Sequence, residues 1–555
     1  MERLPGDILL EIAHYLPTPS EILHLSLTCA GIFHGLTPAL YSHVALRGAQ
    51  QCAATLDMLS THPARARHVR ELRVCLAAGS KPASGQLLGA RRQVLLDGYR
   101  ISAAVRRAAH NMEILRAFVW DGEELPPNDD MWFALRICCT RLKYIGTAFG
   151  SILPSPKSHL FDFSDLHGFT LTFKKGFYWH HVGFTRNEPI PGYHRLWDML
   201  IKRCPHLQEL ELDGDSPDDP VDAQRLTRGR WPDLRKLVLG NVVIDWHTAV
   251  NPASKRPFIT FLEEHCGIET LHLVGHQPSV AAPDLLSAVQ PEALPVLTEF
   301  HGSLQQIQAL QNKKTLTSIC VPDTIVLREG TPLSVSTVLN QIPSLTSLTL
   351  TFGLEHGYDN GSMLHALISA CPQLQHLDLT YACKPSFSLD NFARSLRNLC
   401  RLRSLHLRIV RNPSEDPLST CGLRIARTNP RLRTFTLEFL VRSTSFPTRG
   451  APPAVQESAS FELVADQHGL PSSIRVCERW RPRRLRLFCP AVVVRRYVMP
   501  LRPDGSPGTA KGGLGALLVE RSPAGEDARL IFCCVLLVVL AVLSFTVFPE
   551  AGLKV

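Results

Sequence analysis

The chain has 555 residues, more than one ordinary hydrophobic core accommodates, so several domains or one long repeat array are expected. Hydrophobic residues make up 45% of the sequence and charged residues 20%, which excludes a disordered protein. The net charge of +9 is spread along the chain and argues against a nucleic-acid-binding protein. The 16 cysteines are irregularly spaced and form no CxxC pair, so they predict reduced core thiols in place of a zinc site or a disulfide framework.

The N-terminal region carries a dense apolar pattern that predicts three short helices. Four apolar residues share one face of the first helix: Ile8, Leu9, Ile12 and Leu16. Pro17 then ends this helix. The apolar pattern continues into two further helices with Ile22, Leu25 and Phe33. A bundle of this size cannot bury all these side chains by itself, so the surplus apolar surface predicts a partner protein.

This stretch resembles the F-box. The matching residues are Leu4-Pro5-Gly6-Asp7-Ile8-Leu9, Ile12, Leu16-Pro17, Leu25-Ser26-Leu27-Thr28-Cys29, Phe33 and Pro38-Ala39-Leu40-Tyr41. Many family members have Trp at the position of Phe33. The resemblance implies that residues 1–48 dock on the Skp-family adaptor, which links them to cullin. The contact residues that it implies are Leu4, Pro5, Ile8, Leu9, Ile12, Leu16, Pro17, Ile22, Leu25 and Phe33. A plain helical cap on a repeat array is the alternative.

From about residue 68 to residue 440 one pattern recurs, a small residue or Pro followed by L-x-x-L-x-L, and the later copies are roughly 28 to 30 residues apart. Clear copies are Cys204–Leu212, Trp231–Leu239, Pro343–Leu350, Cys371–Leu379, Leu402–Leu407 and Pro430–Leu437. The alternation predicts strands, and the segments between them have helical patterns. This pattern is similar to the leucine-rich repeats of F-box proteins. It predicts an α/β solenoid over residues 65–440 with parallel strands on its concave face.

The outward positions of these predicted strands are candidate contacts for a protein substrate. They are acidic in one repeat, neutral in another and basic in a third, which suits recognition of a specific partner. The candidates are Glu209, Glu211, Asp213, Ser347, Thr349, His376, Asp378, Ser404, His406 and Arg408. The alternative is that these strand faces are simply solvated.

Two segments fit the repeat pattern poorly. Residues 161–193 include the aromatic run Phe177–His181, and they are either a binding loop or a divergent repeat. The two histidines of this run have no third ligand beside them, so no metal site is predicted. Residues 441–501 are predicted to form a C-terminal cap, whose arginines cluster around Trp480.

An uncharged apolar run, Leu530 to Phe548, follows a polar linker over residues 502–528. As a helix it would be roughly 28 Å long, about the thickness of the bilayer hydrocarbon. We therefore expect a single transmembrane helix at 529–549, which would anchor the protein on the cytoplasmic face of an intracellular membrane. Without insertion, the protein would reside in the cytoplasm or nucleus. A buried core helix or buried strands are the alternatives for this run.

The sequence contains no P-loop, no dinucleotide-binding glycine motif, no nucleophile elbow and no HExxH motif. We therefore predict a non-catalytic chain without cofactor or metal. Together with the two resemblances, this predicts the substrate-recognition adaptor of a Skp–cullin ubiquitin ligase, which would deliver its substrate for degradation. A membrane-anchored repeat scaffold without a degradative role is the alternative.

Overall fold

The computed structural model describes residues 4–16, 19–76, 87–152, 154–174, 191–214, 221–240, 242–244, 255–274, 285–325, 332–353, 362–382, 387–411, 416–441, 455–468, 470–480, 492–501 and 517–520. The chain divides into two compact units, Met1–Asp323 and Thr324–Val555.

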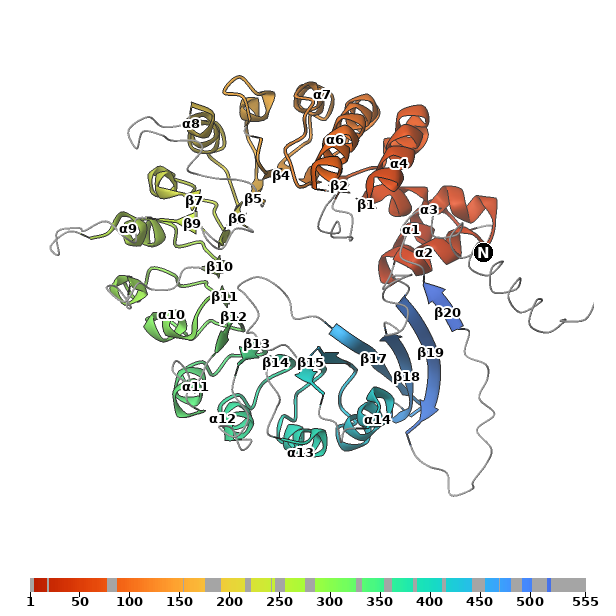
Figure 1. Ribbon diagram of the computed structural model, residues 1–555, viewed down its shortest axis with the longest axis vertical. Coiled ribbons are helices and arrows are strands. Elements are labelled where there is room, and N and C mark those ends of the chain that lie inside the picture. Colours follow the sequence, from red (N-terminus) through yellow and green to blue (C-terminus); the bar gives the residue numbers. More distant parts are fainter. Residues whose placement is uncertain are drawn as a thin grey trace, which may run out of the picture. The chain divides into compact units, whose positions relative to one another are not determined.

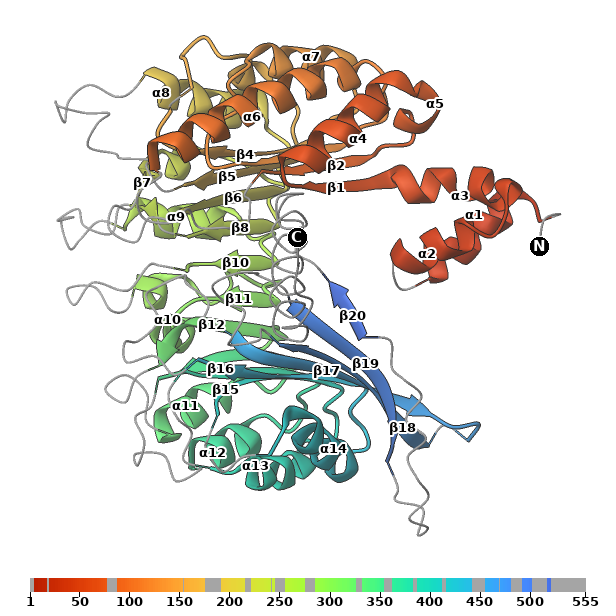
Figure 2. The same cartoon turned by 45° about the vertical axis from the view of Figure 1, so that its right-hand side comes forward.

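The first unit begins with three helices: α1 (Gly6–Tyr15), α2 (Pro19–Ser26) and α3 (Ala30–Ser42). Their common core consists of Leu9, Ala13, Ile32 and Leu36. Gly35 allows the close approach of α3 to α1, because a Cβ atom at this position would lie 2.6 Å from Leu9 Cδ1. Figure 2 shows these helices beyond the start of β1 (His43–Arg47), apart from the helices that cover the sheet. We refer to residues 4–42 as the helical module.

The rest of the first unit is a parallel sheet covered by helices on one face (Figure 1). Its strands after β1 are β2 (Glu71–Cys75), β3 (Ala117–Asp121), β4 (Tyr144–Phe149), β5 (Gly168–Phe173), β6 (Glu209–Gly214), β8 (Lys236–Leu239), β10 (Thr270–His272), β11 (Glu299–His301) and β12 (Ser318–Ile325). Each of them pairs in parallel with the next strand. A separate two-stranded ladder joins β7 (Val221–Asp222) and β9 (Val242–Val243).

The covering helices of the first unit lie between successive strands in the sequence. They are α4 (Ala49–Thr61), α5 (Pro63–Ala66), α6 (Leu87–Ala109), α7 (Asp130–Cys138), η1 (His159–Asp162), α8 (Pro191–Asp198), η3 (Met199–Arg203), η4 (Gln224–Arg228), α9 (Pro257–Glu264), η5 (Leu285–Ala288) and α10 (Leu304–Ala309). The strands turn apolar residues toward these helices, and in β6 both Leu210 and Leu212 are buried. The polar residues between them, such as Glu211, remain partly exposed on the opposite face.

The second unit continues the same repeat with four parallel strands: β13 (Ser347–Phe352), β14 (His376–Tyr381), β15 (Ser404–Val410) and β16 (Thr434–Leu440). Its helices are α11 (Pro332–Leu339), α12 (Ser362–Ala370), α13 (Leu389–Ser395), η6 (Leu396–Asn398) and α14 (Leu418–Thr428). These repeats and those of the first unit confirm the prediction of a leucine-rich-repeat-like α/β solenoid.

After β16 the strand direction changes. Four antiparallel strands extend the sheet of the second unit: β17 (Val455–Ala465), β18 (Pro471–Trp480), β19 (Val492–Pro500) and β20 (Leu517–Glu520). The predicted cap, residues 441–501, therefore contains β17 to β19, whereas β20 lies within the predicted polar linker, residues 502–528. The sequence permits them because apolar and polar residues alternate here without intervening helical segments. The described part of the irregular segment 161–193 also forms a repeat strand, β5, whereas Phe177–His181 lie outside the described residues.

The predicted fold class needs one correction at the C-terminus. No helix among the residues that the structure describes is long and apolar enough to cross a membrane. The apolar run 530–548 itself lies outside the described residues. The prediction of a transmembrane helix as part of the fold is therefore wrong, and the fold is a mixed α/β repeat sheet whose last described strands are antiparallel.

Candidate functional site

The helical module exposes apolar side chains that its small core does not use. Ile8 is 45% exposed, and Leu27 is 69% exposed at the end of α2. Leu4, Leu10, Tyr15 and Leu23 are exposed as well. Exposed apolar groups of this density on so small an element indicate a surface that another protein covers.

The ten predicted adaptor contacts divide by burial. Leu4, Pro5 and Ile8 are exposed at the start of the module. Five are half-buried: Ile12, Leu16, Ile22, Leu25 and Phe33. Of these five, Ile22 and Leu25 pack against the module's own core. Leu9 is a core residue, and Pro17 lies outside the described residues. The sequence prediction omitted the exposed Leu10, Tyr15 and Leu23, because it followed only the residues that match the family pattern.

On the second unit, the uncovered face of the sheet aligns polar residues from neighbouring strands in rows. In one row Thr349 lies opposite Asp378, which lies opposite His406. In the next row Thr380 lies opposite Arg408, which lies opposite Glu438. The parallel register thus brings together side chains that are about 30 residues apart in the sequence.

Four of these side chains form a charge network, which we define as Asp378, His406, Arg408 and Glu438. His406 Nδ1 lies 3.1 Å from Asp378 Oδ2, and His406 Nε2 lies 3.5 Å from Glu438 Oε2, an ion pair without a hydrogen bond among the described residues. Arg408 closes the ring, with Nε 3.2 Å from Glu438 Oε2 and Nη1 3.5 Å from Asp378 Oδ1. Each charge has a neighbour of the opposite sign, but the two cations also meet, because Arg408 Nη2 lies 3.1 Å from His406 Nδ1 and by itself lowers the pKa of His406.

The network sets the protonation of its members. Burial by itself would lower the pKa of His406, but its contacts with the Asp378 and Glu438 carboxylates raise that pKa to about 9. The contact with His406 in turn lowers the pKa of Glu438, although burial opposes this shift. At neutral pH the imidazole is therefore charged, and the strand face presents a fixed pattern of two cations and two anions.

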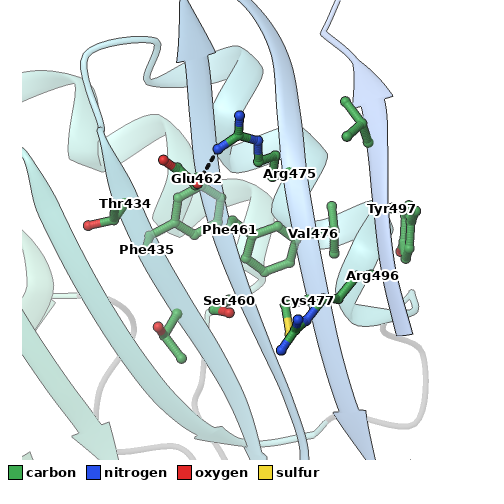
Figure 3. Close-up of a pocket in the computed structure, with 12 residues that line it drawn as sticks. Thr434, Phe435, Ser460, Phe461, Glu462, Arg475, Val476, Cys477, Arg496 and Tyr497 are labelled. Atoms are coloured by element: carbon green, nitrogen blue, oxygen red, sulfur yellow. Dashed lines mark hydrogen bonds and ion pairs between the residues drawn. The ribbon is translucent and has the colours of Figure 1, made fainter. Parts of the chain in front are cut away.

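A groove of about 550 Å³ lies beside this network, over β16 to β19 (Figure 3). Figure 3 shows the Glu462–Arg475 ion pair, at 3.2 Å, toward one end of the groove, and Ser460, Cys477 and Arg496 toward the other. Ser458 joins the groove's strand to the network, because its hydroxyl donates to Glu438 Oε1 at 3.2 Å. The network therefore adjoins a groove whose lining is largely apolar, with Phe435, Phe461, Val476 and Val498 among its residues.

The predicted substrate contacts fall into two separate groups. In the second unit the structure joins Asp378, His406 and Arg408 directly, with Ser347, Thr349, His376 and Ser404 in the adjoining rows. In the first unit Glu209, Glu211 and Asp213 lie on β6, where Glu211 pairs with Lys236 at 2.5 Å. The sequence prediction omitted Glu438 and Lys236. Both occupy outward positions of recognised repeats, so aligning the repeats would have found them.

Three of the described thiols, those of Cys139, Cys204 and Cys371, are poorly suited to nucleophilic attack. Burial raises the pKa of Cys139 to about 12 and that of Cys371 to about 12. Burial also raises the pKa of Cys204. A thiol attacks as its thiolate, so these three residues are inert at neutral pH.

Comparison with known proteins gives limited information. No family model matches the chain, and no curated protein matches it in sequence. Among solved structures, the chain is similar to one in the crystal structure of the yeast Rad7 and Elc1 complex, with 14% identity and a TM-score of 0.33 over 60% of this chain and 88% of the other. It is also similar to one in the TLR13–ssRNA13 complex, with 13% identity and a TM-score of 0.30 over 67% of this chain and 43% of the other. At these TM-scores neither likeness supports an argument about function.

Proposed function

We propose that this chain is a non-catalytic substrate-recognition adaptor of a Skp–cullin ubiquitin ligase. In this proposal the helical module docks on the Skp-family adaptor, and the uncovered strand faces of the repeats bind a protein substrate. The observation that carries the proposal is the exposure of apolar side chains such as Ile8 and Leu27 on a module with a core of only four buried residues.

Two further features support the docking role of the module. Its residues match the order and spacing of the F-box, as described above. The module also lies beyond the start of β1, which leaves its exposed side chains available to a partner (Figure 2). A helical cap would instead turn its apolar residues toward the repeat that it covers.

The strand faces suit recognition of a folded or extended protein. The charge network holds its groups in fixed positions through mutual ion pairs, so little side-chain entropy is lost on binding. A complementary pattern of charges on the substrate would give specificity, whereas the adjacent groove could receive a side chain of the substrate. Ubiquitin transfer would take place on other subunits, and this chain would supply proximity.

Co-precipitation of the full chain with a purified Skp-family adaptor tests the docking step. We expect Ile8→Asp to abolish capture, because a carboxylate would be buried in an apolar contact. Val296→Asp is the matched control, since Val296 is 43% exposed on a repeat and Ile8 is 45% exposed on the module. Equal capture of the wild-type chain and the Ile8→Asp variant, or no capture of the wild-type chain, would contradict the proposal.

The degradative outcome requires a second measurement. Proteins labelled by a proximity-labelling fusion of the chain should accumulate on proteasome inhibition, and this accumulation should be lost in the Ile8→Asp variant. Bound partners whose abundance responds to neither change would indicate the alternative, a repeat scaffold without a degradative role.

A further inference from the structure

A cluster of potential metal ligands lies on the uncovered strand face of the first unit. His272 at the end of β10 lies directly opposite His301 at the end of β11, because the two strands pair in parallel. Glu299 precedes His301 by two residues, so it lies on the same face of β11. The ligand atoms of these three residues all lie within 4.8 Å of one another.

The two imidazoles point their Nε2 atoms at the same carboxylate oxygen. The rings stack with centroids 3.6 Å apart and an interplanar angle of 7°. Glu299 Oε1 lies 2.8 Å from His301 Nε2 and 3.6 Å from His272 Nε2. Ligand atoms around a tetrahedral Zn²⁺ lie roughly 3.3 Å apart, given metal–ligand distances of about 2.0–2.2 Å. The observed separations bracket that value.

One of these nitrogens lacks the hydrogen bond that burial normally demands. Within the described part of the chain, His272 Nε2 is buried without a hydrogen-bond partner. Burial and the adjacent His301 lower the pKa of His272 to about 4, and burial also lowers the pKa of His301. Both rings are thus neutral at pH 7, and the tautomer protonated on Nδ1 offers its Nε2 lone pair to a metal.

The surroundings are compatible with a bound dication. Lys236 is the nearby cation on β8, but its charge is balanced by Glu211 at 2.5 Å. On the other side, Cys320 of β12 lies directly opposite His301. Its neighbours Ile319 and Val321 are buried, whereas Cys320 is partly exposed on the face of the histidines. Its Sγ is not among the ligand atoms that lie within 4.8 Å of one another, so Cys320 would become a fourth ligand, of a kind that zinc favours, after its side chain turns toward the cluster.

We propose that His272, His301 and Glu299 form a site for Zn²⁺ or a similar divalent transition metal, and that Cys320 on the next strand turns toward the bound metal as its fourth ligand. The ligands come from three consecutive strands, so the metal would link neighbouring repeats of the first unit. Because a metal that binds only the folded chain stabilises it by mass action, the site would make the stability of this unit dependent on metal.

Cobalt titration of the purified full chain tests the site, because tetrahedral Co²⁺ gives intense visible bands and a cobalt–thiolate bond adds a near-ultraviolet charge-transfer band. All chains used in the titration carry Cys266→Ser and Cys400→Ser, because these two exposed thiols could bind cobalt outside the proposed site. We expect saturable visible bands that Zn²⁺ displaces, together with a rise in the melting temperature. The charge-transfer band, but not metal binding, should be lost in Cys320→Ser.

His301→Ala and the more conservative His301→Gln should both weaken cobalt binding by more than about 100-fold. Loss of a residue that only hydrogen-bonds to a metal ligand typically weakens metal binding by about 10–100-fold, and loss of a ligand itself should cost more. Circular dichroism checks that both variants fold. His206→Ala is the matched control, because His206 also pairs with a carboxylate, Asp233 at 3.0 Å, but has no second histidine beside it. Absence of cobalt bands in the wild-type chain, or retention of binding in folded His301→Gln, would overturn the proposal.

Discussion

His406 lies between the carboxylates of Asp378 and Glu438, and the guanidinium of Arg408 completes the ring of charges. Each strand contributes its polar residues at outward positions, so the strand register places the four side chains on one face of neighbouring strands. The sequence indicates which residues face outward. It does not indicate that Glu438 reaches His406, because that contact depends on side-chain conformations across two strands.

The raised pKa of His406 predicts a specific pH dependence of stability. The folded pKa of about 9 exceeds the ordinary value of 6.5, so the stabilisation is complete below pH 6.5 and is lost as the pH rises through about 9. We expect the wild-type chain to lose about 3 kcal/mol relative to His406→Gln between about pH 6 and about pH 10. Urea denaturation at both pH values measures this difference.

His376→Gln is the control for this prediction, because His376 lies on the same face at an exposed position of β14. Its stability should follow the wild-type curve across the same pH range. If wild type and His406→Gln showed parallel pH dependence, His406 would not be held in its charged form by the network.

At the scale of elements, the leucine pattern predicted the repeat strands well. Strands β6, β8 and β13 to β16 all coincide with copies of L-x-x-L-x-L. The antiparallel strands β17 to β20 were not predicted as strands, because they lack that pattern. Their place in the sheet is decided by pairing with β16, which is a tertiary interaction that local sequence does not encode.

Helix α14 packs on β17 through a glycine. A Cβ atom at Gly422 would lie 2.2 Å from the ring of buried Phe461, which is itself stacked on Phe435 at 4.6 Å. We expect Gly422→Ala to destabilise the chain by roughly 1–3 kcal/mol, because the added methyl group would overlap the buried ring and force it to shift. Gly31→Ala is the control, since Gly31 in α3 has only Cys29 Sγ within 4.0 Å. Its denaturation midpoint should be unchanged or slightly higher, and equal losses in both variants would contradict this packing argument.

Two adjacent residues of the helical module have different expected roles, one in folding and the other in docking. Leu9 belongs to the four-residue core, whereas Ile8 is exposed. We expect Leu9→Ala to destabilise the module by roughly 2–4 kcal/mol and Ile8→Ala to change its stability by less than about 0.5 kcal/mol. Hydrogen exchange of α1 to α3 in the full chain measures both effects. Similar protection losses in the two variants would show that Ile8 is also part of the core.

For the molecule as a whole, the sequence predicted a helical module followed by a repeat array, and the structure confirms the repeat array. The prediction of a C-terminal transmembrane helix as part of the fold was wrong. It relied only on the length and hydropathy of one apolar run, and these two properties alone do not determine the structure of a segment. The cluster of His272, Glu299 and His301 was not foreseen. Its members belong to different repeats, and only the register of β10 with β11 brings them together.

The proposal that this chain is a non-catalytic adaptor predicts how its cysteines behave in a ubiquitination reaction. A transferase that carries ubiquitin on cysteine needs an accessible thiol with a lowered pKa. Here Cys139 and Cys371 are buried and their pKa values are raised to about 12. We therefore expect these two thiols to resist alkylation in the folded chain at neutral pH, while the exposed Cys266 and Cys400 react readily. Mass spectrometry after timed iodoacetamide treatment, with the urea-unfolded chain as reference, resolves the four sites.

Incubation with activating enzyme, conjugating enzyme and ubiquitin should then give no adduct that a reducing agent removes. Such an adduct on any cysteine would make the chain a catalytic subunit and would require the adaptor proposal to be abandoned.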